Sequence, residues 1–232
     1  MTPATRFSVT ALVLLLFGAP GLQAAAGDDL RLIEALQRRD AEAAHALLQA
    51  GVDVNVRRAD GATALAWAAH WDDAETAARL IAAGADPNAA NALGVTPLML
   101  AGTNRGARMA AMLLEAGADP NAARPNGETA LMHAARAGAV EVARALVAHG
   151  ADVNATTSRG FSPLMFAAAE GHAGVAGVLA ETGADLAART EASVPQRRGS
   201  RRSAANDGNP RRLRENQALL ISQLQQDGDL EP

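Results

Sequence analysis

Short apolar stripes recur along the middle of the chain with a period of 33 residues. One stripe spaces its apolar side chains three and four residues apart, as on one face of an α-helix; it comprises Val140, Ala143, Leu146 and Val147. A second apolar segment precedes each stripe, and the leucines at matching positions in these segments are Leu65, Leu98, Leu131 and Leu164. The pattern therefore predicts two short helices in every period.

Glycine and hydroxyl residues mark the ends of these helices. A Thr or Ser follows a turn glycine in each internal unit, where its hydroxyl can cap the first helix; these residues are Thr63, Thr96, Thr129 and Ser162. Pro97 and Pro163 follow two of the caps, at the first helical position, where a missing N–H costs nothing. In the fourth unit we expect a turn at residues 137–138 and a left-handed Gly150 after the second helix.

Two helices of this length cannot bury their apolar faces alone, whereas stacked pairs share one continuous core. Only 3% of the residues are aromatic, so this core must consist mainly of Ala, Leu, Val and Met. We predict an all-α solenoid of about five helix-turn-helix modules with short turn or hairpin connections. The repeat domain should cover residues 27–189, divided into residues 27–57, 58–90, 91–123, 124–156 and 157–189. The first unit reads as an N-terminal cap, because it carries polar residues where the others are apolar: Arg31, Gln37, Arg38 and Arg39.

Two phrases of the repeat resemble the ankyrin repeat: Gly94-Val95-Thr96-Pro97-Leu98 and Gly150-Ala151-Asp152-Val153-Asn154. The resemblance extends over roughly residues 28–186 in five consecutive units. It implies a scaffold that binds a macromolecular partner and catalyses nothing.

The sequence departs from the ankyrin pattern at two positions. The His that the family places after the Leu is replaced by Ala66, Met99, Met132 and Met165, so the Thr–His hydrogen bond implied by the resemblance is absent. The glycine between the two helices is present as Gly138 and Gly171, but Asp72 replaces it in the second unit and it shifts to Gly106 in the third. We expect a rebuilt loop there.

The fifth unit should be the least stable. Gly174 and Gly177 lie within its second helix, and each costs about 1 kcal/mol relative to Ala. We therefore expect residues 172–186 to fray before residues 140–150.

The first residues of the chain have the pattern of a secretory signal. Arg6 precedes an apolar run over residues 7–17, and small residues follow at positions 24–26. We expect residues 1–26 to be cleaved, which would place the mature protein in the periplasm of a bacterium or outside the cell. An uncleaved anchor is the alternative.

The last part of the chain should lie outside the stack. Residues 190–209 form a predicted disordered, Arg-rich linker. Its arginines could be a solvated arm, could contact an anionic membrane or an acidic partner, or could bind nucleic acid, which export disfavours. Residues 210–228 form a predicted helix with Leu213, Leu220 and Leu224 on one face. This helix could dock on the fifth unit, remain solvated or bind separately.

The sequence contains no catalytic or cofactor-binding motif, and we expect no enzyme activity, no cofactor and no metal site. Cys is absent, and the histidines fall at different phases of the repeat, where we expect them on the surface or in turns: His45, His70, His133, His149 and His172. An aspartate recurs once per unit at Asp53, Asp86, Asp119, Asp152 and Asp185. These carboxylates should bond the turn backbone, because copies one module apart cannot share a calcium ion.

In proteins similar to this family, partners lie along the turn tips and the exposed face of the first helices. Carried over by position, this face comprises Asp60, His70, Trp71, Leu93, Val95, Thr103, Asn104, Asn126, Glu128, Arg136, Arg159, Phe161 and Glu170. Trp71, Phe161 and Arg136 are the expected anchors, because aromatic residues and Arg often dominate binding energy. Alternatively, Trp71 and Phe161 pack between neighbouring turns.

The leading hypothesis is a monomeric, exported scaffold for one or more protein partners. The alternative is an accessory or inhibitory subunit that regulates a periplasmic enzyme through the same face. The net charge of −4 is too small to favour a class of partner.

Overall fold

The computed structural model describes residues 29–188. In this range the chain forms ten α-helices and no strand: α1 (Asp29–Gln37), α2 (Ala41–Gln49), α3 (Ala64–His70), α4 (Ala74–Ala82), α5 (Pro97–Asn104), α6 (Ala107–Glu115), α7 (Ala130–Ala137), α8 (Val140–Ala148), α9 (Pro163–Glu170) and α10 (Ala173–Glu181). None of these helices is long and apolar enough to cross a bilayer. The expected signal (1–26), linker (190–209) and C-terminal helix (210–228) lie outside the described residues.

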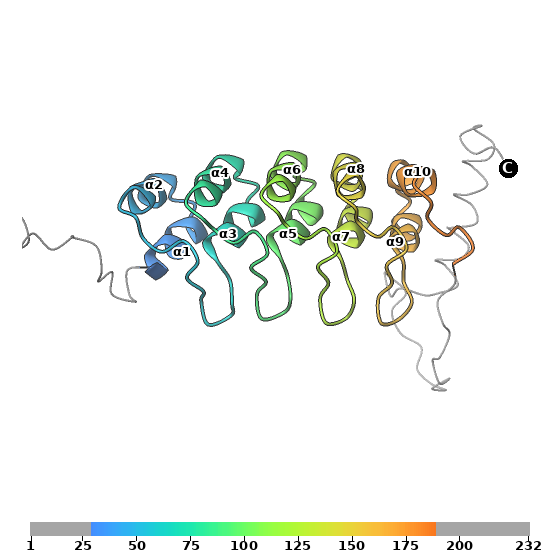
Figure 1. Ribbon diagram of the computed structural model, residues 1–232, viewed down its shortest axis with the longest axis horizontal. Helices are drawn as coiled ribbons and strands as arrows, with labels where there is room; N and C mark the ends of the chain where they lie inside the picture. The colour runs from blue at the N-terminus through green and yellow to red at the C-terminus, as the bar shows by residue number, and fades with distance from the viewer. Residues whose placement is uncertain (1–28, 189–232) are drawn as a thin grey trace, which may run out of the picture.

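Consecutive helices form pairs, and the pairs stack in a single row (Figure 1). The odd-numbered helices lie side by side in one layer and the even-numbered helices in a second layer, while long loops extend from the odd-numbered layer to one side. Each odd-numbered helix contacts the next odd-numbered one, and each even-numbered helix contacts the next even-numbered one. The predicted all-α solenoid of five modules is therefore confirmed.

The repeated leucines form one buried file through the stack. Leu65, Leu98, Leu131 and Leu164 are each at most 2% exposed and belong to one continuous apolar cluster. Burying a leucine side chain contributes about 2 kcal/mol. The remaining core is mainly Ala, Leu, Met and Val, as the low aromatic content predicts.

Three of the four predicted caps hold the first helices as expected. The hydroxyl oxygens of Thr63, Thr96 and Ser162 accept the backbone N–H three residues on, at 3.2, 3.3 and 3.3 Å. Pro97 and Pro163 begin their helices. The expectation is wrong for Thr129, whose buried hydroxyl makes no hydrogen bond within the described residues. Thr129 and Thr63 share φ −110° and ψ 167°, so the orientation of the hydroxyl differs and the backbone does not.

The turn between the two helices has the same backbone conformation in every module. The residues at the matching position are left-handed in all five modules: Arg39, Asp72, Arg105, Gly138 and Gly171. The expected shift of the glycine to residue 106 is wrong, because Gly106 has φ −76° and precedes α6 as its N-cap. A Cβ on Gly106 would collide with the Asp72 carboxylate of the preceding module. Close approach between modules, and not a rebuilt loop, therefore explains this glycine.

The recurring aspartates bond the turn backbone as predicted. In each module the Asp Oδ1 accepts the N–H two residues on, for example from Asn88 to Asp86 at 2.9 Å. The asparagines of the same phrase do more, because each joins its module to the next. Asn88 Nδ2 donates to the carbonyl of Gly117 at 2.9 Å, and Asn88 Oδ1 accepts the N–H of Asp119 at 2.7 Å. The same pair of bonds recurs at Asn55, Asn121 and Asn154.

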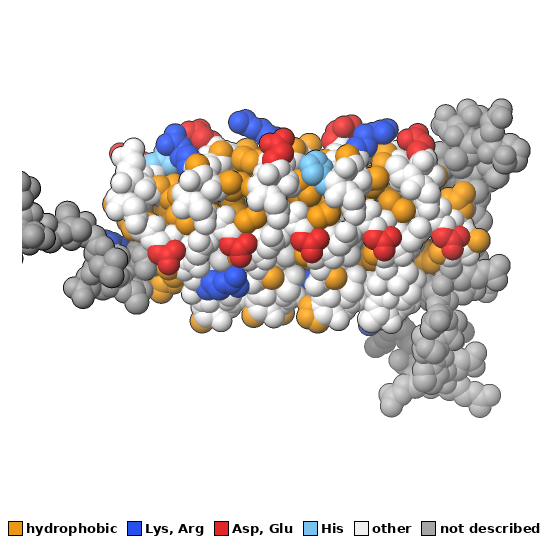
Figure 2. All heavy atoms as spheres, in the orientation of Figure 1, with side chains coloured by type: hydrophobic (Ala, Val, Ile, Leu, Met, Phe, Trp, Pro, Cys, Tyr) orange, Lys and Arg blue, Asp and Glu red, His pale blue; other side chains and the backbone are white. Residues whose placement is uncertain are grey.

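The aspartates are exposed once per module, in keeping with the regularly spaced acidic side chains along one face of the stack in Figure 2. Each carboxylate is already engaged by its own turn.

Candidate partner-binding face

The expected partner-binding residues fall at four positions that recur from module to module. The loop tips carry Asp60, Leu93, Asn126 and Arg159, and the position two residues later carries Val95, Glu128 and Phe161. The ends of the odd-numbered helices carry His70, Thr103 and Arg136 at one position and Trp71, Asn104 and Glu170 at the next. Because the modules stack in register, each position forms a row along the molecule (Figure 1).

The loop tips are exposed along their whole row. Asp60 and Asn126 accept a backbone N–H two residues on, at 3.0 and 3.1 Å, so these side chains also hold the tip turns. Leu93 is 64% exposed at the tip of the third module, and Arg159 is exposed at the tip of the fifth. The tips therefore present an apolar and a cationic group to solvent.

The second row is less accessible than predicted, and the clearest correction is Glu128. Its side chain is buried and pairs with Arg124 and Arg136, the latter at 2.9 Å between Oε1 and Nη2. Burial alone would raise the pKa of Glu128, but the hydrogen bonds from Arg136 and Asn126 and the charge of Arg136 lower it to about 2. The carboxylate is thus an ionised internal anchor that positions Arg136. It is not a free group on the face.

Arg136 and two phenylalanines form a cluster between the fourth and fifth modules. The Arg136 guanidinium lies over the Phe166 ring, 4.5 Å from its centroid, which is within the range of a cation–π contact. The Phe161 ring packs against Phe166 with centroids 5.8 Å apart, and Phe161 is half-buried. Sequence reasoning missed Phe166, although it recurs at the position of His133 in the preceding module.

His133 departs from the expectation of a surface histidine. It is half-buried, and its Nδ1 lies 3.0 Å from the Thr103 hydroxyl of the preceding module. That hydroxyl donates to the Met99 carbonyl at 3.0 Å, so Nδ1 of His133 must donate to Thr103. Burial lowers the pKa of His133 below its usual 6.5, which keeps the ring neutral at pH 7. Thr103 therefore links two modules and also lies on the face.

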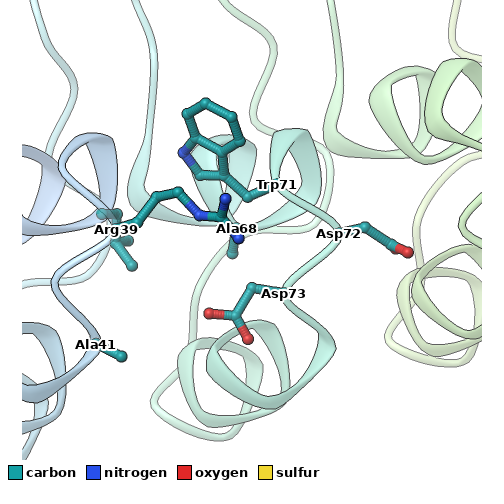
Figure 3. A pocket seen from close by; sticks show the side chains of 7 residues that line it. Arg39, Ala41, Ala68, Trp71, Asp72 and Asp73 are labelled. Carbon is teal, nitrogen blue, oxygen red and sulfur yellow. The ribbon is translucent and has the colours of Figure 1, made fainter.

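An aromatic group lies at the opposite end of the row, between the first and second modules. Trp71 is 39% exposed, its ring contacts His70 with centroids 4.7 Å apart, and the Arg39 guanidinium lies 5.2 Å from its centroid. Beside it is an open pocket of about 340 Å³, lined by Leu36, Arg39, Ala41, Ala68, Trp71, Asp72 and Asp73 (Figure 3). Trp71 offers a large, accessible ring.

The remaining residues divide between structural and accessible roles. Asn104 Nδ2 donates to the carbonyls of Ala69 and His70 at 3.2 and 2.7 Å, which ties the third module to the second. Val95 is half-buried against the core. Glu170 is exposed at the end of α9. The exposed groups of the face that can offer apolar or cationic contact are therefore Trp71, Leu93, Arg136 and Arg159.

No group of three or more His, Cys, Asp or Glu side chains in residues 29–188 is arranged to hold a metal ion. The chemistry that these residues offer to a partner is apolar and aromatic contact, cation–π contact and guanidinium hydrogen bonding.

Comparison with known proteins agrees with this architecture. A family model described as "Ankyrin repeats (3 copies)" matches residues 32–124 and 117–190. No curated protein matches the chain.

Proposed function

Because the chain belongs to the ankyrin-repeat family, whose members are generally protein–protein interaction modules, we propose that it is a non-catalytic scaffold that binds a protein partner through the loop tips and the ends of the odd-numbered helices. The observation that carries the proposal is the exposure of Leu93 and Trp71 on this face. Exposed large apolar side chains are otherwise rare in residues 29–188, where Leu30 is the third.

The proposed anchors are Trp71, Leu93 and Arg136. Aromatic and Arg side chains supply much of the binding energy when a partner covers them. Glu128 fixes the Arg136 guanidinium before binding, which reduces the side-chain entropy lost on association. Phe161 supports Arg136 indirectly, since it packs against the Phe166 ring beneath the guanidinium.

Capture of the partner by variants of the full chain tests the face. We expect Trp71→Ala combined with Leu93→Ala to weaken capture at least tenfold, because truncating a hot-spot residue costs about 2 kcal/mol. Arg108→Ala is the matched control, since Arg108 is exposed on α6 in the other helical layer. Equal capture by the double variant and the control would assign the partner to another surface.

We also propose that the protein acts after export. The support is the order of Arg6, the apolar run over residues 7–17 and the small residues at 24–26. Amino-terminal sequencing of the protein purified from its native compartment should then begin at Gly27. A protein that retained Met1 and stayed in the cytosol would contradict this. A pull-down that returns one stoichiometric enzyme with altered activity would favour the alternative of a regulatory subunit.

A further inference from the structure

The contacts between the fourth and fifth modules define which positions of a module face the next one. The Arg136 carbonyl accepts from His172 Nε2 at 3.1 Å, and the His172 ring lies against Gly138. Val140 Cγ2 lies 2.9 Å from the place of a Cβ on Gly174. Arg144 Nη1 lies 3.8 Å from Glu181 Oε2. The forward-facing positions are therefore those of Arg136, Gly138, Val140 and Arg144.

In the fifth module the same four positions hold only alanine and glycine: Ala169, Gly171, Ala173 and Gly177. Gly171 and Ala173 are exposed, and a Cβ on Gly171 or Gly177 would meet no atom within 4 Å. We call these four residues the C-terminal flank. No side chain of the flank is larger than a methyl group, and none is charged.

The outer surface at the opposite end of the stack, in the first module, is polar. The positions of the fifth module that meet the fourth are those of Phe166, His172, Gly174 and Glu181. Their counterparts in the first module are polar and exposed: Glu34, Asp40, Glu42 and Gln49. A terminal module that ends in water needs a polar outer face. The first module has one, whereas the C-terminal flank does not.

The chain itself supplies a segment suited to cover this flank. It leaves the described region at Ala188, seven residues after α10 ends at Glu181, and continues to residue 232. Residues 210–228 carry Leu213, Leu220 and Leu224 at the spacing of one helical face. Helices approach most closely where the side chains between them are small, so the Ala and Gly flank can accept the backbone of a helix with its leucines inserted.

The length of the connection favours the same chain over a second copy. The chain has 21 residues between Ala188 and Pro210, and a flexible link of that length has an end-to-end distance of about 25 Å. Such a link holds a docking segment at an effective concentration of about 1 mM or more. A second copy would reach this concentration only in very concentrated solution.

We propose that residues 210–228 form a helix that packs on the C-terminal flank and caps the stack, so that the row of modules ends in a polar surface at both ends. The face that carries Trp71, Leu93 and Arg136 stays free.

The absence of cysteine makes this proposal directly testable by cross-linking. In the full chain, Gly177→Cys with Leu220→Cys should form an intramolecular disulfide under mild oxidation, seen as a faster monomer band on a non-reducing gel. Ser222 lies on the opposite side of the predicted helix, and Ala78 occupies the position of Gly177 in the second module. The pairs Gly177→Cys with Ser222→Cys and Ala78→Cys with Leu220→Cys should therefore cross-link at least tenfold more slowly.

A disulfide-linked dimer as the main product would overturn the proposal in favour of a second copy on the flank. Equal rates for all three pairs, or no cross-link in folded protein, would overturn it as well. Hydrogen exchange supplies an independent measurement, because Leu220→Asp with Leu224→Asp should speed exchange in α10 at least tenfold and leave α6 unchanged. Unchanged protection of α10 would reject the cap.

Discussion

At the scale of single residues, the asparagine that ends each repeat phrase joins neighbouring modules most directly. Its amide uses both the donor and the acceptor, so that one side chain satisfies two backbone groups of the following module. The carboxylate of Asp86 holds the Asn88 backbone in place for this purpose. The two side chains therefore have different roles: Asp stabilises the turn of its own module, and Asn connects that turn to the next module.

Replacing Asn88 by Ala removes both inter-module bonds and should lower the free energy of unfolding by about 2 kcal/mol, at about 1 kcal/mol per hydrogen bond. Urea denaturation at pH 7 measures this loss. Arg108→Ala, an exposed truncation that makes no such bridge, should stay within about 0.5 kcal/mol of the parent. A comparable effect from both variants would show that the amide contributes nothing specific.

Glu128 makes the stability of the stack depend on pH. Its pKa falls from 4.5 to about 2 on folding, so the folded chain holds its proton less tightly than the unfolded chain. The resulting stabilisation, at most about 3 kcal/mol, is complete above pH 4.5 and is lost as the pH falls toward 2. The gap in unfolding free energy between the parent and Glu128→Gln should therefore close over this interval in urea titrations. A gap that stays constant from pH 7 to pH 2 would contradict the ion-pair role.

At the scale of elements, local sequence determines most of what is observed. Apolar spacing and hydroxyl caps act within a few residues, and they locate the helices well. The glycine pattern does not predict the left-handed turn at Arg105, because the register of the repeat fixes that backbone conformation whatever the residue. A left-handed non-glycine residue costs roughly 1–2 kcal/mol, which the packing of α5 and α6 offsets.

The second helix of the fifth module offers a test of local propensity. Gly177→Ala should stabilise α10 by about 1 kcal/mol through helix propensity, because the new methyl group meets no described atom within 4 Å and leaves the C-terminal flank made of small residues. Gly174→Ala should gain less, since its Cβ would lie 2.9 Å from Val140 Cγ2. Hydrogen exchange in residues 172–186 should be faster than in residues 140–150 of the parent and should slow in Gly177→Ala. Protection equal to that of residues 140–150 in the parent would mean that these glycines do not weaken the helix.

At the scale of the whole molecule, the sequence predicted the stack and the rows of the face but not the availability of each side chain. Glu128 and Phe161 lie at loop positions that are commonly exposed, yet they are covered by Arg136 and Phe166, which approach from helices α7 and α9. Arg136 lies 8 residues after Glu128 and Phe166 lies 5 residues after Phe161, so each pairing depends on how far the side chain reaches. Periodicity carries no information on such contacts.

The asparagine bridges run in one direction only, each from a module to the one that follows, and this gives the array a head and a tail. A duplicated 33-residue unit inserted after residue 123 would form the two hydrogen bonds with the Asn121 amide, and its own asparagine would bond the unit that follows. The array can therefore be lengthened internally with the existing contacts. Lengthening at the tail is different, because Ala187 stands where the next connecting amide would be required. The amide that would connect a sixth module at this end is therefore missing.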